Sequence, residues 1–288
     1  MVSVKTFHNT ILKSCSYCIY DCESMEAYLI DIGDVDPIMG FIETFGARIK
    51  GVFLTHPHAD HVHGIDDLRI FSHKNSLAMN EDKTLAQRYP ETQGKGLPIY
   101  LSSNSKRLVQ ENFHYIFIEH KMGGGTPKLD LESVDDFNAD KMLELETIKV
   151  VPIPLLHGRM ETTGWVFIEN TNEKKHCIAY LTDCNYISEL SIERIKNAVK
   201  GGILDHLVID ALRAQEHSSH NSFDKALFYA DKIGAEHTWF THMSHDFLHE
   251  DIQKYIDEHL NCYANLSAIV WRGGSVCPSY DGLEILCR

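Results

Sequence analysis

The sequence has no apolar run long enough to cross a bilayer, and it lacks the excess of positive charge that binding to nucleic acids needs. Its 288 residues carry a formal net charge of −14. A membrane-spanning helix needs about 20 consecutive apolar residues, and phosphate backbones are bound by clustered lysine and arginine. We therefore expect neither a membrane protein nor a partner of large nucleic acids. A small phosphate ester remains compatible with an acidic protein, because bound divalent cations can dominate the local field.

The sequence also lacks a secretory signal and a second cysteine pair, and both absences bear on the state of its cysteines. The first residues, Met1 to Cys15, lack the basic start and apolar stretch of a secretory signal, so we expect a cytoplasmic protein whose eight cysteines are thiols. Cys15, Cys18 and Cys22 lie close together, but no second pair at zinc-finger spacing accompanies them. We interpret them as small residues buried in strands. A structural metal held by these three is the alternative.

The sequence also lacks linkers and long repeats, and we therefore predict one compact domain that comprises residues 1–288. Apolar β-type runs alternate with helical patterns in the second half, as in βαβ units, and predict sheets covered by helices. The predicted helices are Asp36 to Gly46, Ser191 to Lys200, Ser222 to Ile233 and His249 to Leu260. The predicted strands are Ala27 to Ile32, Val52 to Thr55, Ile99 to Leu101, Tyr115 to Ile118, Ile148 to Leu156, Trp165 to Ile168, Ile178 to Thr182 and Leu207 to Ile209.

One stretch, near residues 121–141, breaks the alternation and is predicted to be a loop or insertion. It opens with the glycines Gly123, Gly124 and Gly125. Glycines can cradle a phosphate through backbone amides, but neither a strand-to-helix context nor the ending of a P-loop follows here. A loop is therefore the preferred interpretation.

The most informative motif is His56-Pro57-His58-Ala59-Asp60-His61, which follows the apolar run Gly51 to Thr55. A buried strand that ends in a polar turn presents its last side chains to one point, and imidazole with carboxylate suits zinc, manganese or iron. His56 and His58 alternate with Pro57 and point the same way, whereas the adjacent Asp60 and His61 diverge. The divergence suggests two ions, each short of ligands.

Three later β-type runs stop at a histidine or an aspartate, namely at His157, Asp183 and His242. Each is weak evidence alone, but together they complete a dinuclear site. One ion would take His56, His58 and His157, and the other Asp60, His61 and His242, with Asp183 bridging the two.

With these residues the chain resembles the metallo-β-lactamase superfamily, and within it the branch of the phosphonate-pathway phosphodiesterase that acts on phosphoribosyl cyclic phosphate. The resemblance covers the chain from about Ala27 onward. Beyond the ligand motif it rests on four segments: Gly64-Ile65-Asp66-Asp67-Leu68-Arg69, His217-Ser218-Ser219-His220, Thr241-His242-Met243-Ser244-His245-Asp246 and Tyr280-Asp281-Gly282.

The resemblance implies an α/β fold of four layers (αββα), with two mixed sheets between helices, and a cytoplasmic hydrolase that uses two divalent ions, zinc or manganese, with iron as an alternative. A hydroxide held by the two ions would attack a small phosphodiester, either open or cyclic. His220 would protonate the leaving oxygen, since histidine titrates near neutral pH, and Asp60 would orient the hydroxide besides binding metal. Capping of the following helix is the alternative role for His220.

Three further residues are candidates for substrate binding: Arg69, His217 and His245. An arginine near a metal site can hold phosphate with two hydrogen bonds, although Arg69 could instead form a helix-face ion pair. The branch usually opens with a CxCxxC cluster that holds a structural zinc together with the histidine in the position of His245. That opening is absent here, so we do not expect this zinc. His245 is left either to support the site by hydrogen bonds or to line the pocket.

The alternatives are a thioester or lactone hydrolase of the glyoxalase II type, an RNA-processing nuclease, a non-haem di-iron redox protein and a metal-binding protein without activity. The Gly64 to Arg69 and His217 to His220 segments favour the phosphodiesterase. The negative charge opposes the nuclease, and the absence of a flavodoxin-sized region after His242 opposes the redox protein. No motif indicates an interface, so assembly into a homo-oligomer is left open.

Overall fold

The computed structural model describes residues 2–8, 15–72, 96–118, 126–169 and 175–286. It divides into two compact units, Met1–Asp135 and Asp136–Arg288, each of which is described by itself. The prediction of a single domain therefore stays a prediction. No helix among the described residues is long and apolar enough to span a membrane.

The first unit is built on a mixed sheet. Its strands follow one another across the sheet in the order β1-β2-β3-β4-β5-β6. The pairs β1–β2 and β2–β3 are antiparallel, and the pairs from β3 to β6 are parallel. The strands are β1 (Val2–His8), β2 (Cys15–Asp21), β3 (Glu26–Ile30), β4 (Arg48–Phe53), β5 (Leu97–Leu101) and β6 (Leu129–Ser133).

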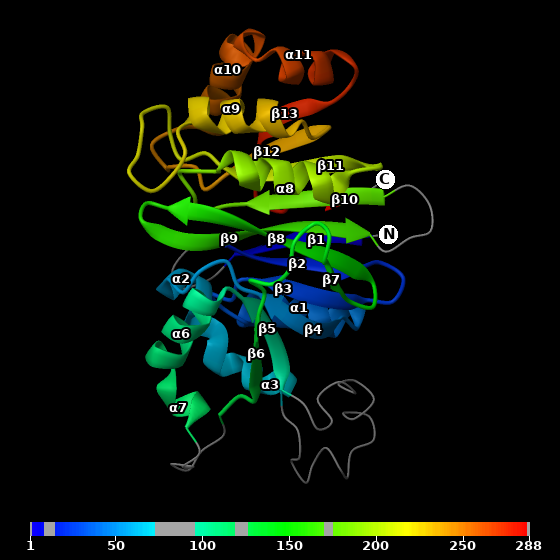
Figure 1. Ribbon diagram of the computed structural model, residues 1–288, viewed down its shortest axis with the longest axis vertical. Coiled ribbons are helices and arrows are strands. Elements are labelled where there is room, and N and C mark those ends of the chain that lie inside the picture. The colour runs from blue at the N-terminus through cyan, green and yellow to red at the C-terminus, as the bar shows by residue number, and fades with distance from the viewer. Residues whose placement is uncertain (1, 9–14, 73–95, 119–125, 170–174, 287–288) are drawn as a thin grey trace. The chain divides into compact units, whose positions relative to one another are not determined.

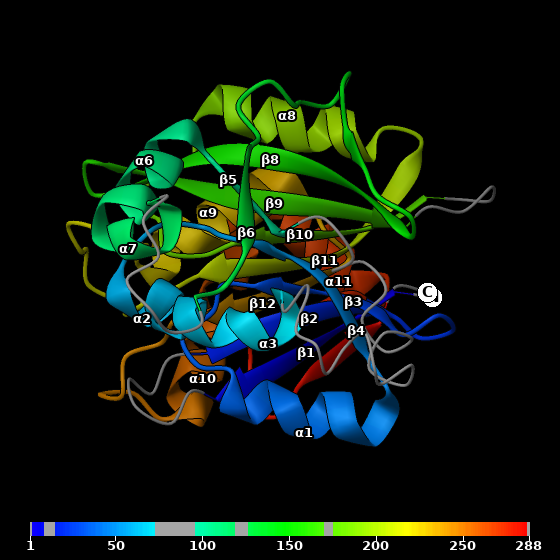
Figure 2. The ribbon, with the colours of Figure 1, turned by 90° about the horizontal axis from the view of Figure 1, so that it is seen from below.

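Helix α1 (Asp36–Phe45) packs on this sheet and lies along β1 (Figure 2). It ends at Gly46, whose φ of 69° is a left-handed conformation that glycine adopts without strain. The ring of Phe41 contacts Phe7 and Tyr20 edge-on, with centroids 5.7 and 5.1 Å apart. The other helices of the unit are α2 (Ala59–Val62), η1 (His63–Leu68), α3 (Arg69–Ser72), α6 (Ser103–Asn112) and α7 (His114–Phe117).

Two sequence predictions in the first unit need correction. Tyr115 to Ile118 was predicted as a strand from its β-branched and aromatic residues, but Tyr115, Ile116 and Phe117 lie in α7 and only Ile118, which follows the helix, is extended. The segment directly follows α6 and packs Ile116 and Phe117 against the core, so tertiary contacts override the local propensity. Part of the predicted loop near 121–141 is strand β6, which pairs in parallel with β5. The three glycines of that segment lie outside the described residues.

The second unit holds another mixed sheet, in the order β13-β12-β11-β10-β9-β8-β7 (Figure 1, green to red). Strands β7 to β10 pair antiparallel and β10 to β13 in parallel. The strands are β7 (Leu143–Glu144), β8 (Ile148–His157), β9 (Met160–Glu169), β10 (Lys175–Leu181), β11 (Gly202–Asp210), β12 (His237–Thr241) and β13 (Ser275–Pro278). A short strand, β14 (Glu284–Leu286), ends the described chain.

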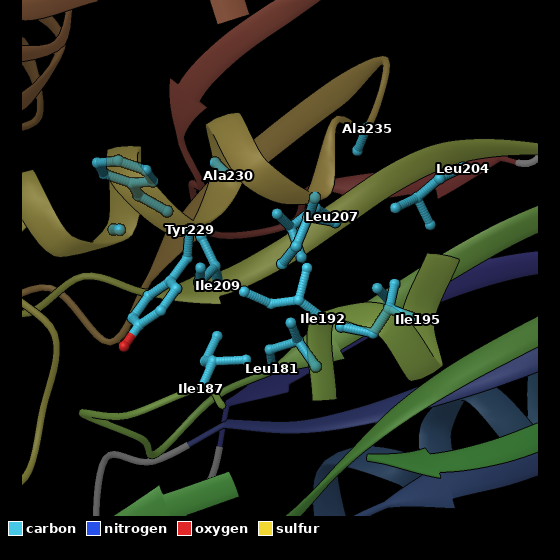
Figure 3. Close-up of a cluster of buried hydrophobic side chains, with 14 of the residues drawn as sticks. Leu181, Ile187, Ile192, Ile195, Leu204, Leu207, Ile209, Tyr229, Ala230 and Ala235 are labelled. Atoms are coloured by element: carbon cyan, nitrogen blue, oxygen red, sulfur yellow. The ribbon is translucent and has the colours of Figure 1, made fainter. Parts of the chain in front are cut away.

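The helices of the second unit are α8 (Glu189–Val199), α9 (Phe223–Ile233), α10 (His249–His259), η3 (Leu260–Cys262) and α11 (Ala264–Trp271). Ile192 and Ile195 of α8 and Ala230 of α9 bury their apolar face against Leu207 and Ile209 of β11 (Figure 3). The helices predicted in this half are thus confirmed, with bounds that differ by at most two residues. Two mixed sheets flanked by helices confirm the predicted fold class. Because β10, β11 and β12 are parallel, their carboxyl ends share one edge, where Asp183, Asp210 and His242 lie.

Candidate metal centre

In the first unit, the predicted metal turn follows β4. His56 is fully buried, His58 precedes α2, and Asp60 and His61 lie in the first turn of that helix. Nε2 of His56 lies 2.9 Å from Nδ1 of His58. Two nitrogens on one tetrahedral zinc ion are about 3.3 Å apart, given Zn–N bonds of about 2.0–2.1 Å. The two imidazoles therefore converge in nearly the arrangement that a shared ion requires.

A buried carboxylate orients this turn. Asp31 follows β3 with a φ of 59° and accepts hydrogen bonds from the backbone N–H of Thr55 at 2.8 Å and from the Thr55 hydroxyl. Its Oδ2 also lies 2.8 Å from Nδ1 of His61. The Nδ1–H of His61 is thereby engaged, so Nε2 carries the lone pair that a metal binds. Nε2 faces Oδ2 of Asp60 at 3.4 Å, so these two predicted ligands converge rather than diverge.

In the second unit, His157 ends β8 in a similar way. Its Nδ1 lies 2.8 Å from the carbonyl oxygen of Ser219, to which it donates. The lone pair is again on Nε2. A backbone carbonyl thus does for His157 what the Asp31 carboxylate does for His61, and both histidines are held in the tautomer that binds metal through Nε2.

The two other predicted ligands of this unit have strained backbones. Asp183, after β10, has a φ of 50°, and His242, after β12, has a φ of 61°. Non-glycine residues adopt this left-handed region at a cost, and such residues gather at functional sites. Nε2 of His242 lies 3.2 Å from Oδ1 of Asp183. Two residues with left-handed backbones thus place an imidazole and a carboxylate side by side.

This pair also has the electrostatics of a metal site. Burial lowers the pKa of His242, but the hydrogen bond and charge of Asp183 outweigh it and raise the pKa to about 9. The raised pKa favours a proton at the place between the imidazole and the carboxylate that a divalent cation would take. Metal binding at such a site displaces a proton. The donor set thus fits a divalent ion.

His220 is held by a carboxylate that the sequence analysis missed. Asp210 ends β11, is fully buried, and accepts hydrogen bonds from the backbone N–H groups of Cys184 and Asn221. Its Oδ2 lies 2.7 Å from Nδ1 of His220. Burial raises the pKa of Asp210, against the hydrogen bond from His220 and the charge of His242. The signal was available, because Asp210 follows an apolar β-type run just as Asp183 does.

The His220 ring stacks on His242, with centroids 4.2 Å apart, and lies 4.6 Å from the His157 ring. Ligand atoms of His157, Asp183 and His220 all lie within 4.8 Å of one another, and so do those of Asp210, His220 and His242. The second unit by itself therefore brings its predicted ligands around His220. Helix capping is not the role of His220, because the Ser222 side chain caps α9.

One amide connects the loops of this site. Oδ1 of Asn185 accepts a hydrogen bond from the backbone N–H of Gly158 at 2.8 Å, and its Nδ2 donates to the carbonyl oxygen of Ser218 at 2.9 Å. Asn185 thereby ties together the loops that follow β8, β10 and β11. This residue was not predicted from the sequence.

The structure places the three substrate-binding candidates differently from one another. Arg69 is exposed at the start of α3, and its helix-face ion pair is not seen among the described residues. His217 lies 5.3 Å from the His220 ring, and its Nδ1 accepts from the backbone N–H of Ser219. The side chain of His245 is 97% exposed, and its Nε2 lies 3.7 Å from Oδ1 of Asp246. Of the three candidates, His245 has the most exposed side chain.

The early cysteines form no metal cluster among the residues that the structure describes. Cys18 is fully buried in the core of the first unit, and burial raises the pKa of its thiol. Sγ of Cys15 lies 3.5 Å from Nδ1 of His8, and Cys22 is exposed. The interpretation as a buried strand residue is therefore right for Cys18 alone.

The domain family described as "Beta-lactamase superfamily domain" matches residues 35–243, which include all the predicted ligands. The chain belongs to the β-lactamase superfamily. Its fold is that of metallo-hydrolases, and that fold implies divalent metal ions at the histidine and aspartate clusters.

Solved structures agree on the superfamily fold. A diphosphatase from the PhnP family has a TM-score of 0.66 and 23% identity, over 100% of this chain and 98% of that chain. Unliganded yeast PDE1 has a TM-score of 0.62 and 13% identity, over 98% of both chains. Human tRNase Z, short form, has a TM-score of 0.55 and 16% identity, over 100% of both chains. At these identities the likeness concerns the fold alone.

Two curated relatives in sequence carry other names. An octanoyltransferase of Porphyromonas gingivalis is 28% identical over 225 residues, which are 77% of this chain and 38% of the relative. A hydroxyacylglutathione hydrolase of Shewanella denitrificans is 38% identical over 61 residues, which are 21% of this chain and 23% of the relative. The aligned part of the chain thus spans well under half the length of either relative.

Proposed function

We propose that this superfamily member is a metal-dependent phosphodiesterase that acts on a small diester, either open or cyclic. The observation that carries the proposal is the Asp210–His220 pair beside His157 and His242. An alkoxide leaving group needs a proton near neutral pH, and an imidazole fixed through Nδ1 can supply it from Nε2. A thiolate leaves without such help, because thiols ionise near pH 8.5. A built-in proton donor therefore favours a phosphodiester over a thioester.

The predicted metal ligands come from both units: His56, His58, Asp60 and His61 from the first, and His157, Asp183 and His242 from the second. Divalent ions held by these groups, zinc or manganese, would supply Lewis acidity and an activated water. The protein's own part is to fix its imidazoles in the Nε2-binding tautomer, through Asp31 for His61 and the Ser219 carbonyl for His157.

His220 has the remaining chemical role. As the bond between phosphorus and the leaving oxygen breaks, Nε2 of His220 gives its proton to that oxygen. Asp210 keeps Nδ1 engaged and stabilises the charged imidazolium before the transfer. Asp60, which is about two-fifths exposed, is proposed to orient the attacking water as well as to bind metal.

The first experiment compares possible substrates of the metal-loaded protein. The metal content is measured, and the rates of hydrolysis of bis(p-nitrophenyl) phosphate, a cyclic ribose phosphate and a glutathione thioester are compared. Thioesterase activity without diesterase activity would overturn the proposal.

The second experiment replaces the proton donor. His220→Ala should lower kcat for the cyclic ribose phosphate by roughly 10²- to 10⁴-fold, the usual contribution of general acid catalysis. The loss should be smaller for p-nitrophenyl esters, whose leaving group is stable as an anion, and metal content should not change. The matched control is His176→Ala, because His176 also pairs with an aspartate, Asp205, at 2.8 Å. If His220→Ala removes metal instead, His220 is a ligand and the assignment is wrong.

A thioester or lactone hydrolase is the second candidate. The short match to hydroxyacylglutathione hydrolases favours it, but the match covers only 21% of this chain for the relative described above. The two candidates separate in the same assay, because the alanine substitution at His220 should leave thioester hydrolysis nearly unchanged.

A further inference from the structure

Arg213 lies on a segment that is fixed between two loops of the site. The backbone N–H of Leu212 donates to the carbonyl oxygen of Asn221, and the N–H of Phe223 donates to that of Arg213, both at 2.9 Å. On the other side, the N–H of Ser244 donates to the carbonyl oxygen of Leu212 at 2.8 Å. Arg213 is therefore anchored next to the segments that carry His220 and His242.

The side chain of Arg213 has an unusual environment. It is only partly exposed, and its Nε, like that of Arg48, is buried without a hydrogen-bond partner among the residues that the structure describes. Among the described residues no carboxylate lies within 4.0 Å of its guanidinium, which is also true of Arg69, Arg159 and Arg194, whereas Arg48, Arg107 and Arg272 are each paired with a glutamate. A buried donor without a partner is costly, and native proteins rarely leave one without a reason.

The charge of Arg213 acts on His217. Burial lowers the pKa of His217, and the positive charges of His220 and Arg213 lower it further, against the opposing charge of Asp210. The His217 and His220 rings are 5.3 Å apart. This side of the site therefore presents basic groups that an anion would satisfy.

We propose that Arg213 binds the phosphoryl oxygens of the substrate, with His217 alongside it, and that His220 is thereby left to act as the proton donor. The guanidinium presents donors in a planar fork that matches two phosphate oxygens. The arginine predicted from the sequence, Arg69, is exposed on α3, and its role stays a prediction. The identity of the anion as a substrate phosphodiester rests on the proposed function, but the anion site itself does not.

The test compares Arg213→Met and Arg213→Lys with the control Arg272→Met, in which an exposed arginine paired with Glu236 is lost. Binding of inorganic phosphate to the metal-loaded proteins is measured by calorimetry, and KM for the cyclic ribose phosphate by initial rates. Arg213→Met should raise both the phosphate Kd and KM roughly 10- to 100-fold, as expected for a lost charge-assisted hydrogen bond. Arg213→Lys should fall in between, because it keeps the charge and loses the fork. The Arg272→Met control and the metal content of every variant should match the wild type.

The outcomes distinguish the two proposals. A wild type that binds phosphate but hydrolyses no diester overturns the phosphodiesterase, while loss of phosphate binding in Arg213→Met still supports the anion site. A wild type with diesterase activity and an Arg213→Met variant with unchanged Kd and KM overturns the role of Arg213. A wild type that neither binds phosphate nor hydrolyses diesters overturns both. If Arg213→Met does not fold, a Kd of Arg213→Lys equal to that of the wild type overturns the role of Arg213.

Discussion

Two sets of histidines share the sheet of the second unit, and they differ in what surrounds their ring nitrogens. His157, His220 and His242 stand at or after the carboxyl ends of strands, whereas His176, His206 and His237 lie within strands. His206 shows the contrast best. Its Nδ1 accepts a hydrogen bond from Nε1 of Trp239 at 3.2 Å, and its Nε2 donates to the carbonyl oxygen of Leu286 at 3.0 Å.

The other two histidines within strands are also held by protein groups. Nδ1 of His237 lies 2.9 Å from the Ser275 hydroxyl, and Nδ1 of His176 lies 2.8 Å from Asp205. At the carboxyl edge, His157 and His220 are likewise held through Nδ1. What differs is that several imidazoles and carboxylates come together there, within 4.8 Å of one another, and that two backbones are strained. The lesson is that this gathering of ligand groups, rather than an engaged Nδ1 or the number of histidines, separates a functional histidine from a structural one.

The largest expected effect comes from Asp183→Asn. Asparagine tolerates the left-handed backbone at this position, so the fold should persist while the negative charge is lost. Metal content should fall, and hydrolysis should drop by more than the roughly 10- to 100-fold typical of residues that only support a ligand. Elemental analysis and initial rates measure both quantities.

The control for this change is Asp205→Asn, which removes a carboxylate from the His176 pair in the same sheet. Metal content and rate should stay at the wild-type level. An equal loss of metal in both variants would contradict the distinction between the two sets of histidines.

A smaller effect is expected for Asp31→Asn in the first unit. The amide no longer holds the Nδ1–H of His61 by charge, so metal affinity should weaken by roughly 10- to 100-fold, which competition with a chelator measures. Asp130→Asn is the control, since Asp130 accepts a backbone N–H from Gly96 without touching an imidazole. Unchanged affinity in Asp31→Asn would show that this turn needs no carboxylate support.

The smallest effect concerns stability and pH. Burial lowers the pKa of His206 and outweighs the opposing hydrogen bond to Leu286, so the folded state favours the neutral ring. The unfolded chain has a histidine pKa of about 6.5. The stability that neutral His206 contributes is therefore present above about pH 6.5 and is lost as the pH falls toward the folded-state pKa, with a slope of at most about 1.4 kcal/mol per pH unit.

Urea unfolding between about pH 7.5 and 5.5 tests this sign. The wild type should lose more stability than His206→Gln over that interval, while metal content and hydrolysis at pH 7.5 stay equal. Parallel stability curves would mean that His206 titrates alike in both states.

The sequence allowed the fold class and the continuous ligand turn to be predicted, because strand-end patterns and the His56 to His61 motif are local. The supporting groups were missed for a physical reason. Asp31 reaches His61 across 30 residues and Asp210 reaches His220 across 10, and only the folded chain shows those contacts. Arg213 was overlooked because backbone hydrogen bonds bring its segment next to those of His220 and His242 only in the folded chain. Tyr115 to Ile118 was misjudged because packing beside α6 outweighed its strand-like composition.

Asn185 has a consequence for how this protein can be changed. Its single side-chain amide links the loops after β8, β10 and β11 by hydrogen bonds, so the conformation of each loop depends on the other two. Exchanging one loop for that of another superfamily member would leave a backbone N–H or carbonyl without its partner in the remaining ones. A library that seeks new specificity should therefore vary the three loops together, or keep Asn185 and the residues it touches constant.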